Sequence, residues 1–100
     1  PEELPTAFVC HCDMAAHFLM QSLAKAGLSV PRDVSLVSFD NTDLSRFTAP
    51  KLSTFNIDRR KIALEAFNRM MGRLADRGGE PQRIYVDGSF ISRESIRKID

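Results

Sequence analysis

Residues 26–41, AGLSVPRDVSLVSFDN, decide the fold. Gly27 follows a run of helix-forming residues, at a position where a helix ends in the left-handed conformation. Residues 33–40 form a mostly apolar run of strand length that ends at Asp40 and is followed by Asn41. The stretch therefore predicts the end of a helix, a connection, and a strand with polar residues at its carboxyl end.

Upstream of this stretch, the sequence predicts a strand and a helix. Residues 6–10 are a short apolar run without alternation, which is typical of a strand covered on both faces. Asp13 is suited to cap a helix over residues 14–26. The apolar stripe of this helix has spacings of three and four and consists of Ala16, Leu19, Met20, Leu23 and Ala26. Strand, helix and strand make a βαβ unit, which we expect to be right-handed with parallel strands.

Downstream, residues 41–50 predict a loop with one helical turn near residues 43–46. Residues 52–57 alternate in polarity, which fits either a third strand or an extended crossover. Asp58 is suited to cap a long helix that runs to about Arg77 and stops at a Gly-Gly pair. The stripe of this helix, interpreted as core filler, consists of Ile62, Ala63, Ala66, Phe67, Met70, Met71 and Leu74.

Two short strand signals, residues 83–86 and 89–92, flank Asp87 and Gly88. An Asp-Gly pair between two strands is a strong local signal for a hairpin turn. Read locally, the sequence therefore predicts a hairpin here, followed by a polar exit.

The composition is that of one globular domain or a piece of one. The chain has 100 residues and 11.2 kDa, of which 43% are hydrophobic and 27% charged. This excludes a disordered tail and a disulfide-dense miniprotein. No apolar run is long enough to span a bilayer, and no secretory signal is visible. The net charge of +1 argues against a nucleic-acid-binding face, and we interpret residues 59–61 (RRK) as a solvated first helical turn.

Two cysteines, Cys10 and Cys12, flank His11. On a strand the two thiols point to one face and His11 to the other, so only His17 remains as a further zinc ligand. We therefore expect no metal, no disulfide between these positions, and a reducing compartment such as the cytoplasm.

Functional groups are expected at the carboxyl ends of the two parallel strands, because ligands bind there in open α/β sheets. The first end is residues 11–13, beside helix N–H groups that suit hydroxyl or anionic groups. The second is residues 39–41, where a carboxylate and an amide suit vicinal hydroxyls or amines, with Phe39 and Phe47 as an apolar wall. Plain capping by Asp13 and turn formation by Asp40 and Asn41 are the structural alternatives.

Catalytic patterns are absent from the sequence. It contains no Gly-x-Ser-x-Gly elbow, no phosphate-binding loop and no dinucleotide fingerprint. Cys12 at a helix N-terminus is the one candidate nucleophile, and no base is arranged around it in the sequence. We therefore expect a protein that is not an enzyme and needs no cofactor.

Several segments together resemble the C-terminal part of the effector-binding domain of LacI/GalR-family transcription regulators. The central stretch resembles the family's Gly-Leu-x-Val-Pro-x-Asp-Val-Ser-Val-Val-Gly-Phe-Asp-Asp/Asn segment, with Ser38 in place of its second Gly. The other matching segments are residues 5–13 (PTAFVCHCD) with Ala15 and Ala16, residues 50–54 (PKLST), residues 79–81 (GEP) and residues 93–95 (RES). The resemblance covers nearly the whole chain.

The resemblance implies part of a periplasmic-binding-protein-like (type I) domain, a three-layer α/β/α fold with parallel strands. Residues 1–51 would belong to the C-terminal subdomain, residues 52–86 would form a crossover and a helix of the other subdomain, and residues 87–100 a return crossover and tail. This reading of residues 87–88 as a crossover contradicts the locally predicted hairpin.

The resemblance also implies site residues. The family's sugar-contacting Asn of an Ala-Asn-Asp turn falls at Cys12, whose thiol is a weak hydrogen-bonding group, and its Asp falls at Asp13. The ligand-contacting Asp that follows the family's aromatic residue falls at Asp40. The family's dimer interface falls at His17, Gln21, Arg46 and Phe47.

The function implied is that of an effector-binding and dimerisation segment of a transcriptional repressor. A sugar-like or nucleoside effector would control a separate helix-turn-helix module, so DNA would be bound only outside this chain. The alternative is a periplasmic sugar-binding protein of a transport system, which shares the fold. Two free thiols and the Val-Pro-x-Asp-Val-Ser segment favour the regulator.

Overall fold

The computed structural model describes residues 3–100, which divide into two compact units. The first unit contains the chain up to Ile57 together with Ser89–Asp100, and the second is Asp58–Gly88. Each unit is described by itself. The residues of the candidate site all lie in the first unit.

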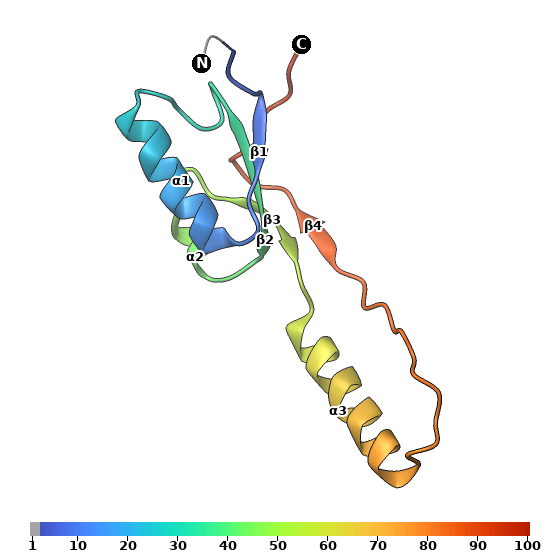
Figure 1. The fold of residues 1–100 in the computed structure, drawn as a ribbon. Coiled ribbons are helices and arrows are strands. Elements are labelled where there is room, and N and C mark those ends of the chain that lie inside the picture. The colour runs from blue at the N-terminus through green and yellow to red at the C-terminus, as the bar shows by residue number, and fades with distance from the viewer. Residues whose placement is uncertain (1–2) are drawn as a thin grey trace. The chain divides into compact units, whose positions relative to one another are not determined.

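The first unit is built on a four-stranded sheet in the order β1-β2-β3-β4 (Figure 1). The strands are β1 (Ala7–Val9), β2 (Ser35–Asp40), β3 (Ser53–Asn56) and β4 (Ser89–Ile91). The pairs β1·β2 and β2·β3 are parallel, whereas β4 is antiparallel to β3. The expected fold class is confirmed, with the correction that the sheet is mixed rather than wholly parallel.

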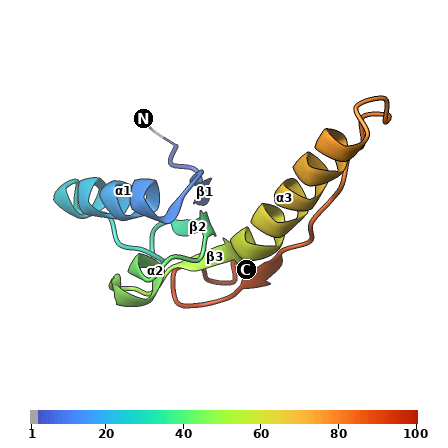
Figure 2. The same ribbon diagram turned by 90° about the horizontal axis from the view of Figure 1, so that it is seen from below.

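Both helices of this unit, α1 (Asp13–Lys25) and α2 (Leu44–Phe47), lie on the same side of the sheet (Figures 1 and 2). Ala16 of α1 packs with Leu36 and Leu52 to form the fully buried core. Gly27 has a φ of +80°, which confirms the predicted left-handed end of α1. The βαβ unit and the single helical turn after β2 are thus formed where the sequence predicts them.

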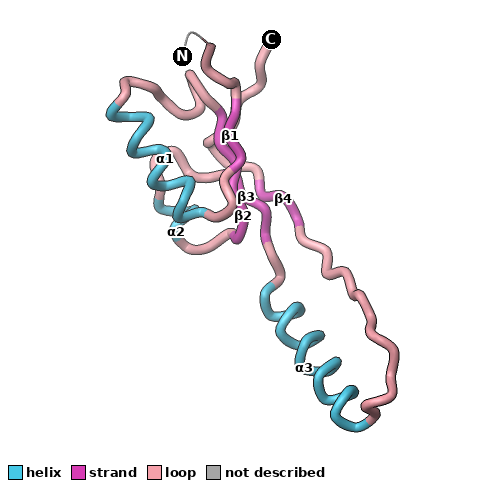
Figure 3. The backbone as a smooth tube through the Cα atoms, viewed as in Figure 1, coloured by secondary structure: helices cyan, strands magenta, loops and turns pink. Residues whose placement is uncertain are grey.

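The second unit consists of α3 (Arg59–Ala75) and an irregular segment that follows it (Figure 3). Asp58 caps α3 as predicted, because its Oδ1 atom accepts a hydrogen bond from Lys61 N at 3.0 Å. The helix ends two residues before Arg77. No residue of α3 is buried, so its apolar stripe packs into no core among the described residues. None of the described helices is long and apolar enough to cross a membrane.

The predicted hairpin around Asp87 and Gly88 is wrong. Residues 83–86 form no strand, and β4 pairs with β3 instead, with Phe55 opposite Phe90. The Asp-Gly pair is a local signal, whereas the pairing partner of β4 lies more than thirty positions earlier in the chain. The assignment of residues 52–86 and 87–100 to particular subdomains stays a prediction.

Candidate functional site

Asp13 is the centre of a buried polar cluster that joins α1 to β2 and β3. Its side chain is 1% exposed, and each carboxylate oxygen accepts two hydrogen bonds. Ser38 Oγ and Thr54 Oγ1 donate to Oδ1 at 2.6 and 2.8 Å. Thr42 donates to Oδ2 through its backbone N at 2.6 Å and its Oγ1 at 2.8 Å. The carboxylate therefore fixes the start of α1 to two strands and to the loop after β2.

These hydrogen bonds determine the protonation of Asp13. Burial by itself raises the pKa of a carboxyl group, since it penalises the charged form. The bonds from Ser38, Thr54 and Thr42 outweigh burial and lower the pKa of Asp13 below its ordinary value. The side chain is thus a carboxylate at neutral pH.

The capping prediction for Asp13 is wrong, because the N-cap of α1 is Cys12. Cys12 has an extended backbone, and its Sγ atom accepts a hydrogen bond from Ala15 N at 3.5 Å. Asp13 is the first helical residue, and its carboxylate is already engaged by donors from outside the helix.

The segment from Cys10 to Cys12 is not part of a strand, contrary to the expectation, because β1 ends at Val9. His11 does not point away from both thiols: its Nε2 atom lies 3.5 Å from Cys12 Sγ. Both cysteines are free. Burial, followed by the neighbouring Cys12, raises the pKa of the Cys10 thiol. Within residues 3–100, no three His, Cys, Asp or Glu side chains are grouped to hold a metal ion.

The carboxyl end of β2 has an unusual backbone. Asp40 and Asn41 have φ values of 111° and 54°, in the region that favours glycine. Asp40 is half-buried and lies opposite Asn56 in the register of β2 and β3. The two strand ends that the sequence singled out, at residues 11–13 and 39–41, are joined through Thr42, which follows Asn41 directly and donates to Asp13.

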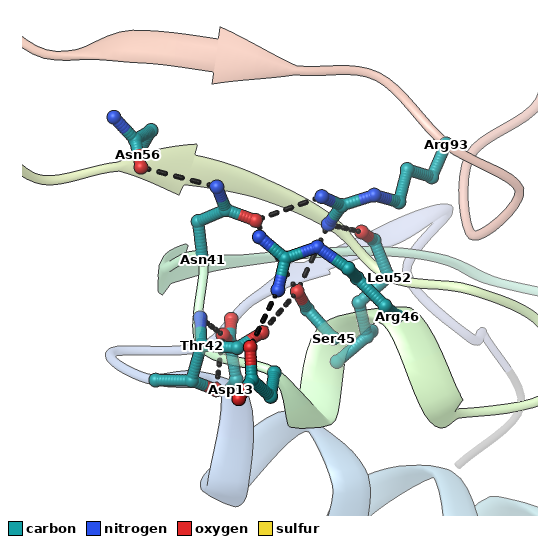
Figure 4. A network of polar contacts seen from close by, with 9 residues as sticks. Asp13, Asn41, Thr42, Ser45, Arg46, Leu52, Asn56 and Arg93 are labelled. Carbon is teal, nitrogen blue, oxygen red and sulfur yellow. Dashed lines mark hydrogen bonds and ion pairs between the residues drawn. The ribbon is translucent and has the colours of Figure 1, made fainter.

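A second polar cluster is formed around the side chain of Asn41 (Figure 4). Asn41 Nδ2 donates to Asn56 Oδ1 at 3.0 Å, and Asn41 Oδ1 accepts from Arg93 Nη2 at 2.8 Å. Arg93 Nη1 donates to Ser45 Oγ and to Leu52 O, both at 2.9 Å. The tail of the chain thus holds the loop that follows β2.

Ser95, two residues further along the tail, bridges β2 and β3. Its Oγ atom donates to Leu36 O at 2.5 Å and accepts from Ser53 N at 2.8 Å. Its carbonyl accepts from Leu36 N at 2.8 Å. Sequence reasoning assigned no role to Arg93 or Ser95. The one sequence feature that marked them is their place in residues 93–95, which match the end of the family's domain.

The expected apolar wall of Phe39 and Phe47 is not formed. Ser38 points to Asp13 on the helix side of the sheet, so Phe39 points to the other side. There it contacts Phe55, with ring centroids 5.9 Å apart. Phe47 belongs to α2, on the helix side, and is 80% exposed.

The four residues expected at a dimer interface lie on two helices that contact each other. His17 and Gln21 are on α1, while Arg46 and Phe47 are on α2. His17 is half-buried against the ring of Phe18, and the other three are exposed. Arg46 forms an exposed ion pair with Asp43 at 2.8 Å.

The second unit has a surface hollow of about 400 Å³ between α3 and residues 82–86. Its lining includes Ile62, Glu65, Ile84 and Tyr85. It contains none of the candidate site residues predicted from the sequence. The carboxyl edge of the sheet in the first unit is therefore the better candidate site.

The mostly parallel sheet, with its polar clusters at one edge, agrees with the comparison of the chain with protein families. The model of the periplasmic binding protein-like domain matches residues 1–96. The chain belongs to this family.

The individual proteins to which the chain is similar include transcription regulators. The chain is 30% identical to the HTH-type transcriptional repressor PurR of Histophilus somni (strain 129Pt), over 98% of this chain and 29% of that protein. Its fold matches the structure of a transcriptional regulator LacI from Bacillus cereus subsp. cytotoxis NVH 391-98, with a TM-score of 0.94 and 26% identity. That match covers 100% of this chain and 36% of the other. The resemblance to the effector-binding domain of LacI/GalR-type regulators is thereby confirmed.

A second similar structure is that of the lac repressor dimer bound to operator and the anti-inducer ONPF. The TM-score is 0.82 and the identity 26%, over 93% of this chain and 32% of that one. The chain thus spans about a third of the length of the relatives it matches.

Proposed function

We propose that this chain is the effector-binding and dimerisation segment of a LacI-type transcriptional repressor. One observation carries the proposal: the carboxyl edge of the sheet holds Asp40 in a left-handed backbone, next to the buried polar cluster around Asp13 and the half-buried one around Asn41. Such bracing is typical of a ligand site, where side chains must be oriented before the ligand arrives. The similarity to the PurR repressor supports the regulatory role.

The proposed effector is a small sugar-like or nucleoside molecule. Asp40 would accept hydrogen bonds from vicinal hydroxyls, which a carboxylate can bind in pairs. Cys12 stands beside this edge as the cap of α1 and would make a weaker polar contact. Asp13 already accepts four hydrogen bonds from the protein, so we assign it the role of holding Thr42 and the loop in place.

The proposed mechanism is allosteric. An effector that binds one conformation of the domain better than another shifts the balance between them. The affinity of a DNA-reading module outside these residues then changes by the same coupling free energy. The near-zero net charge of the chain agrees with DNA being bound by residues outside it. The similar lac repressor structure contains both operator and a small-molecule anti-inducer.

The proposed dimer surface is formed by His17, Gln21, Arg46 and Phe47. Phe47 is the strongest argument, because its ring is 80% exposed and burial against a second copy would remove that apolar surface from water. The similar lac repressor is a dimer, which supports pairing of two copies. We propose no enzymatic activity and no cofactor, and the regulator would act in the cytoplasm, with its DNA.

The coding sequence upstream of Pro1 tests this proposal against the alternative, a periplasmic sugar-binding protein. A helix-turn-helix segment followed by the rest of the effector domain is expected. A secretory signal without a helix-turn-helix would overturn the regulator and favour the transport receptor. Binding of the purified parent protein to DNA fragments from its own promoter region is the functional check.

A further inference from the structure

The backbone at the end of β2 is held in a conformation that its residues do not favour by themselves. Asn tolerates a φ of 54°, but a φ of 111° is rare for Asp. Two such residues in succession persist only when the surrounding structure holds them. Neither residue is glycine, so contacts of their side chains and neighbours must supply the restraint.

Asn41 is restrained through both its backbone and its side chain. Its backbone N donates to Thr54 Oγ1 at 3.3 Å, and its Nδ2 atom donates to Asn56 Oδ1 at 3.0 Å. Both partners belong to β3. On its other side, Asn41 Oδ1 accepts from Arg93 at 2.8 Å and from Ser45 Oγ at 3.4 Å. Both the carbonyl oxygen and the amide group of the side chain are therefore engaged.

Arg93 fixes this arrangement because its guanidinium is a rigid fork. Nη2 donates to Asn41, while Nη1 donates to Ser45 Oγ and Leu52 O at 2.9 Å each. The backbone N of Arg93 is itself held by Ser53 Oγ at 2.8 Å. A lysine ammonium is a point charge on a flexible stem and cannot reproduce the planar geometry toward all three acceptors.

We propose that Arg93 is a positioning residue for the effector site. It holds Asn41 in the left-handed conformation and thereby sets the direction in which Asp40 presents its carboxylate. Arg93 acts through Asn41 and contacts no ligand in this assignment. The part of the inference that concerns effector affinity rests on the proposed function, whereas the part that concerns the backbone of residues 40–42 does not.

Amide hydrogen exchange on the full-length parent protein tests the positioning role without any ligand. Arg93→Ala is expected to speed exchange of the Asn41 and Thr42 amides at least tenfold. The Cys10 amide, which donates to Val37 O between β1 and β2, should keep its rate. Arg97→Ala is the matched control, because Arg97 lies on the same tail but donates to the carbonyls of Pro31 and Arg32.

Unchanged exchange at Asn41 and Thr42, or an equal increase at every sheet amide, would overturn the positioning role. If Arg93→Ala does not fold, Arg93→Lys replaces it: a local increase confined to the two loop amides supports the proposal, and wild-type rates contradict it. A calorimetric titration with D-ribose, D-glucose, sucrose and adenosine forms a second arm. Arg93→Ala should weaken whichever probe binds at least tenfold, with Arg97→Ala unaffected. A wild-type protein that binds none of them contradicts the proposed effector class, and the exchange result still decides the role of Arg93.

Discussion

Thr54 Oγ1 donates a hydrogen bond of 2.8 Å to Asp13 Oδ1, across 41 positions of sequence and from β3 to the first turn of α1. With Ser38 and Thr42, it surrounds a carboxylate by donors alone. The cluster joins α1, β2 and β3 at one point. These hydrogen bonds restrain the carboxyl edge of the sheet, where we propose that the effector binds.

Asp13→Asn is expected to destabilise the protein strongly. An amide keeps the shape of the side chain but turns one acceptor into a donor, which then faces donors of Thr42 or of Ser38 and Thr54. Unsatisfied buried groups cost about 1–3 kcal/mol, so we expect a loss of about 2–3 kcal/mol in the free energy of unfolding. Urea denaturation measures it. Asp43→Asn, at an exposed ion pair, is the control and should cost under ~1 kcal/mol. Equal effects of the two substitutions would refute the role of the cluster.

The lowered pKa of Asp13 predicts how stability changes in acid. The carboxylate is stabilised in the folded protein relative to the unfolded chain, whose Asp has a pKa of about 3.9. Its contribution is complete above that pKa and is lost as the pH falls through the folded pKa. The pKa of Asp33 is also lowered, first by its hydrogen bond from Arg32, so both groups contribute. Unfolding free energies between about pH 2 and 6 should show a shallower acid loss in Asp13→Asn than in the wild type. Identical slopes would show that Asp13 is not responsible.

Cys12→Asn is expected to stabilise α1. A thiol is a weak acceptor, whereas Asn is among the best N-cap residues, and the difference is about 1 kcal/mol. The melting temperature should rise in the Asn variant. It should stay near the wild-type value in the Ala variant, because Ala removes only a weak acceptor. The family resemblance implies a sugar-contacting Asn at this position, so, if the proposed effector is a sugar, the Asn variant should bind it more tightly. A lower melting temperature would mean that the thiol has a role that capping does not describe.

Asp40→Ala in the parent protein is expected to weaken effector binding. A hydrogen bond to a charged group is worth about 1.5 kcal/mol or more, which corresponds to at least a tenfold rise in the dissociation constant. Isothermal titration with a sugar that binds the wild type measures it. Asp43→Ala removes a nearby exposed carboxylate and should bind as the wild type does. Unchanged affinity of a folded Asp40→Ala protein would remove Asp40 from the site.

Phe47→Lys is expected to break the proposed dimer. We propose that a second copy covers the exposed ring of Phe47. The substitution replaces this ring with a charge that resists burial. Sedimentation equilibrium of the 100-residue chain should give a multiple of 11.2 kDa for the wild type and a lower mass for the variant. Tyr85→Lys, at a similarly exposed aromatic residue in the second unit, should leave the mass unchanged. A wild-type monomer at high concentration would contradict pairing through this surface.

The local part of the fold could be predicted from the sequence because its signals lie within a few residues. Gly27 ends α1 by its own conformational freedom, and residues 33–40 show their strand character directly. The hairpin failed for the same reason: Asp87 and Gly88 give a local turn signal, but the partner of β4 is β3, far earlier in the chain.

The candidate site was predictable only in outline. The carboxyl ends of the strands indicated Asp40 and Asp13, because parallel strands direct their ends to one edge. Arg93 and Ser95 could not be found in this way. Their partners lie 40 to 59 positions earlier, and no periodicity or spacing records such contacts. The side chain of Asp13 was assigned to its own helix because capping is the commoner local use of an aspartate.

Ser95 joins β2 and β3 by hydrogen bonds, although both strands are translated long before it. A nascent chain that has emerged only as far as β3 has Leu36 O and Ser53 N without the hydroxyl that joins them in the finished molecule. This link between the amino ends of β2 and β3 can thus form only after Ser95 has left the ribosome. Premature stop codons just before position 93 should therefore yield products that cellular proteases remove, even though every residue of the first three strands is present.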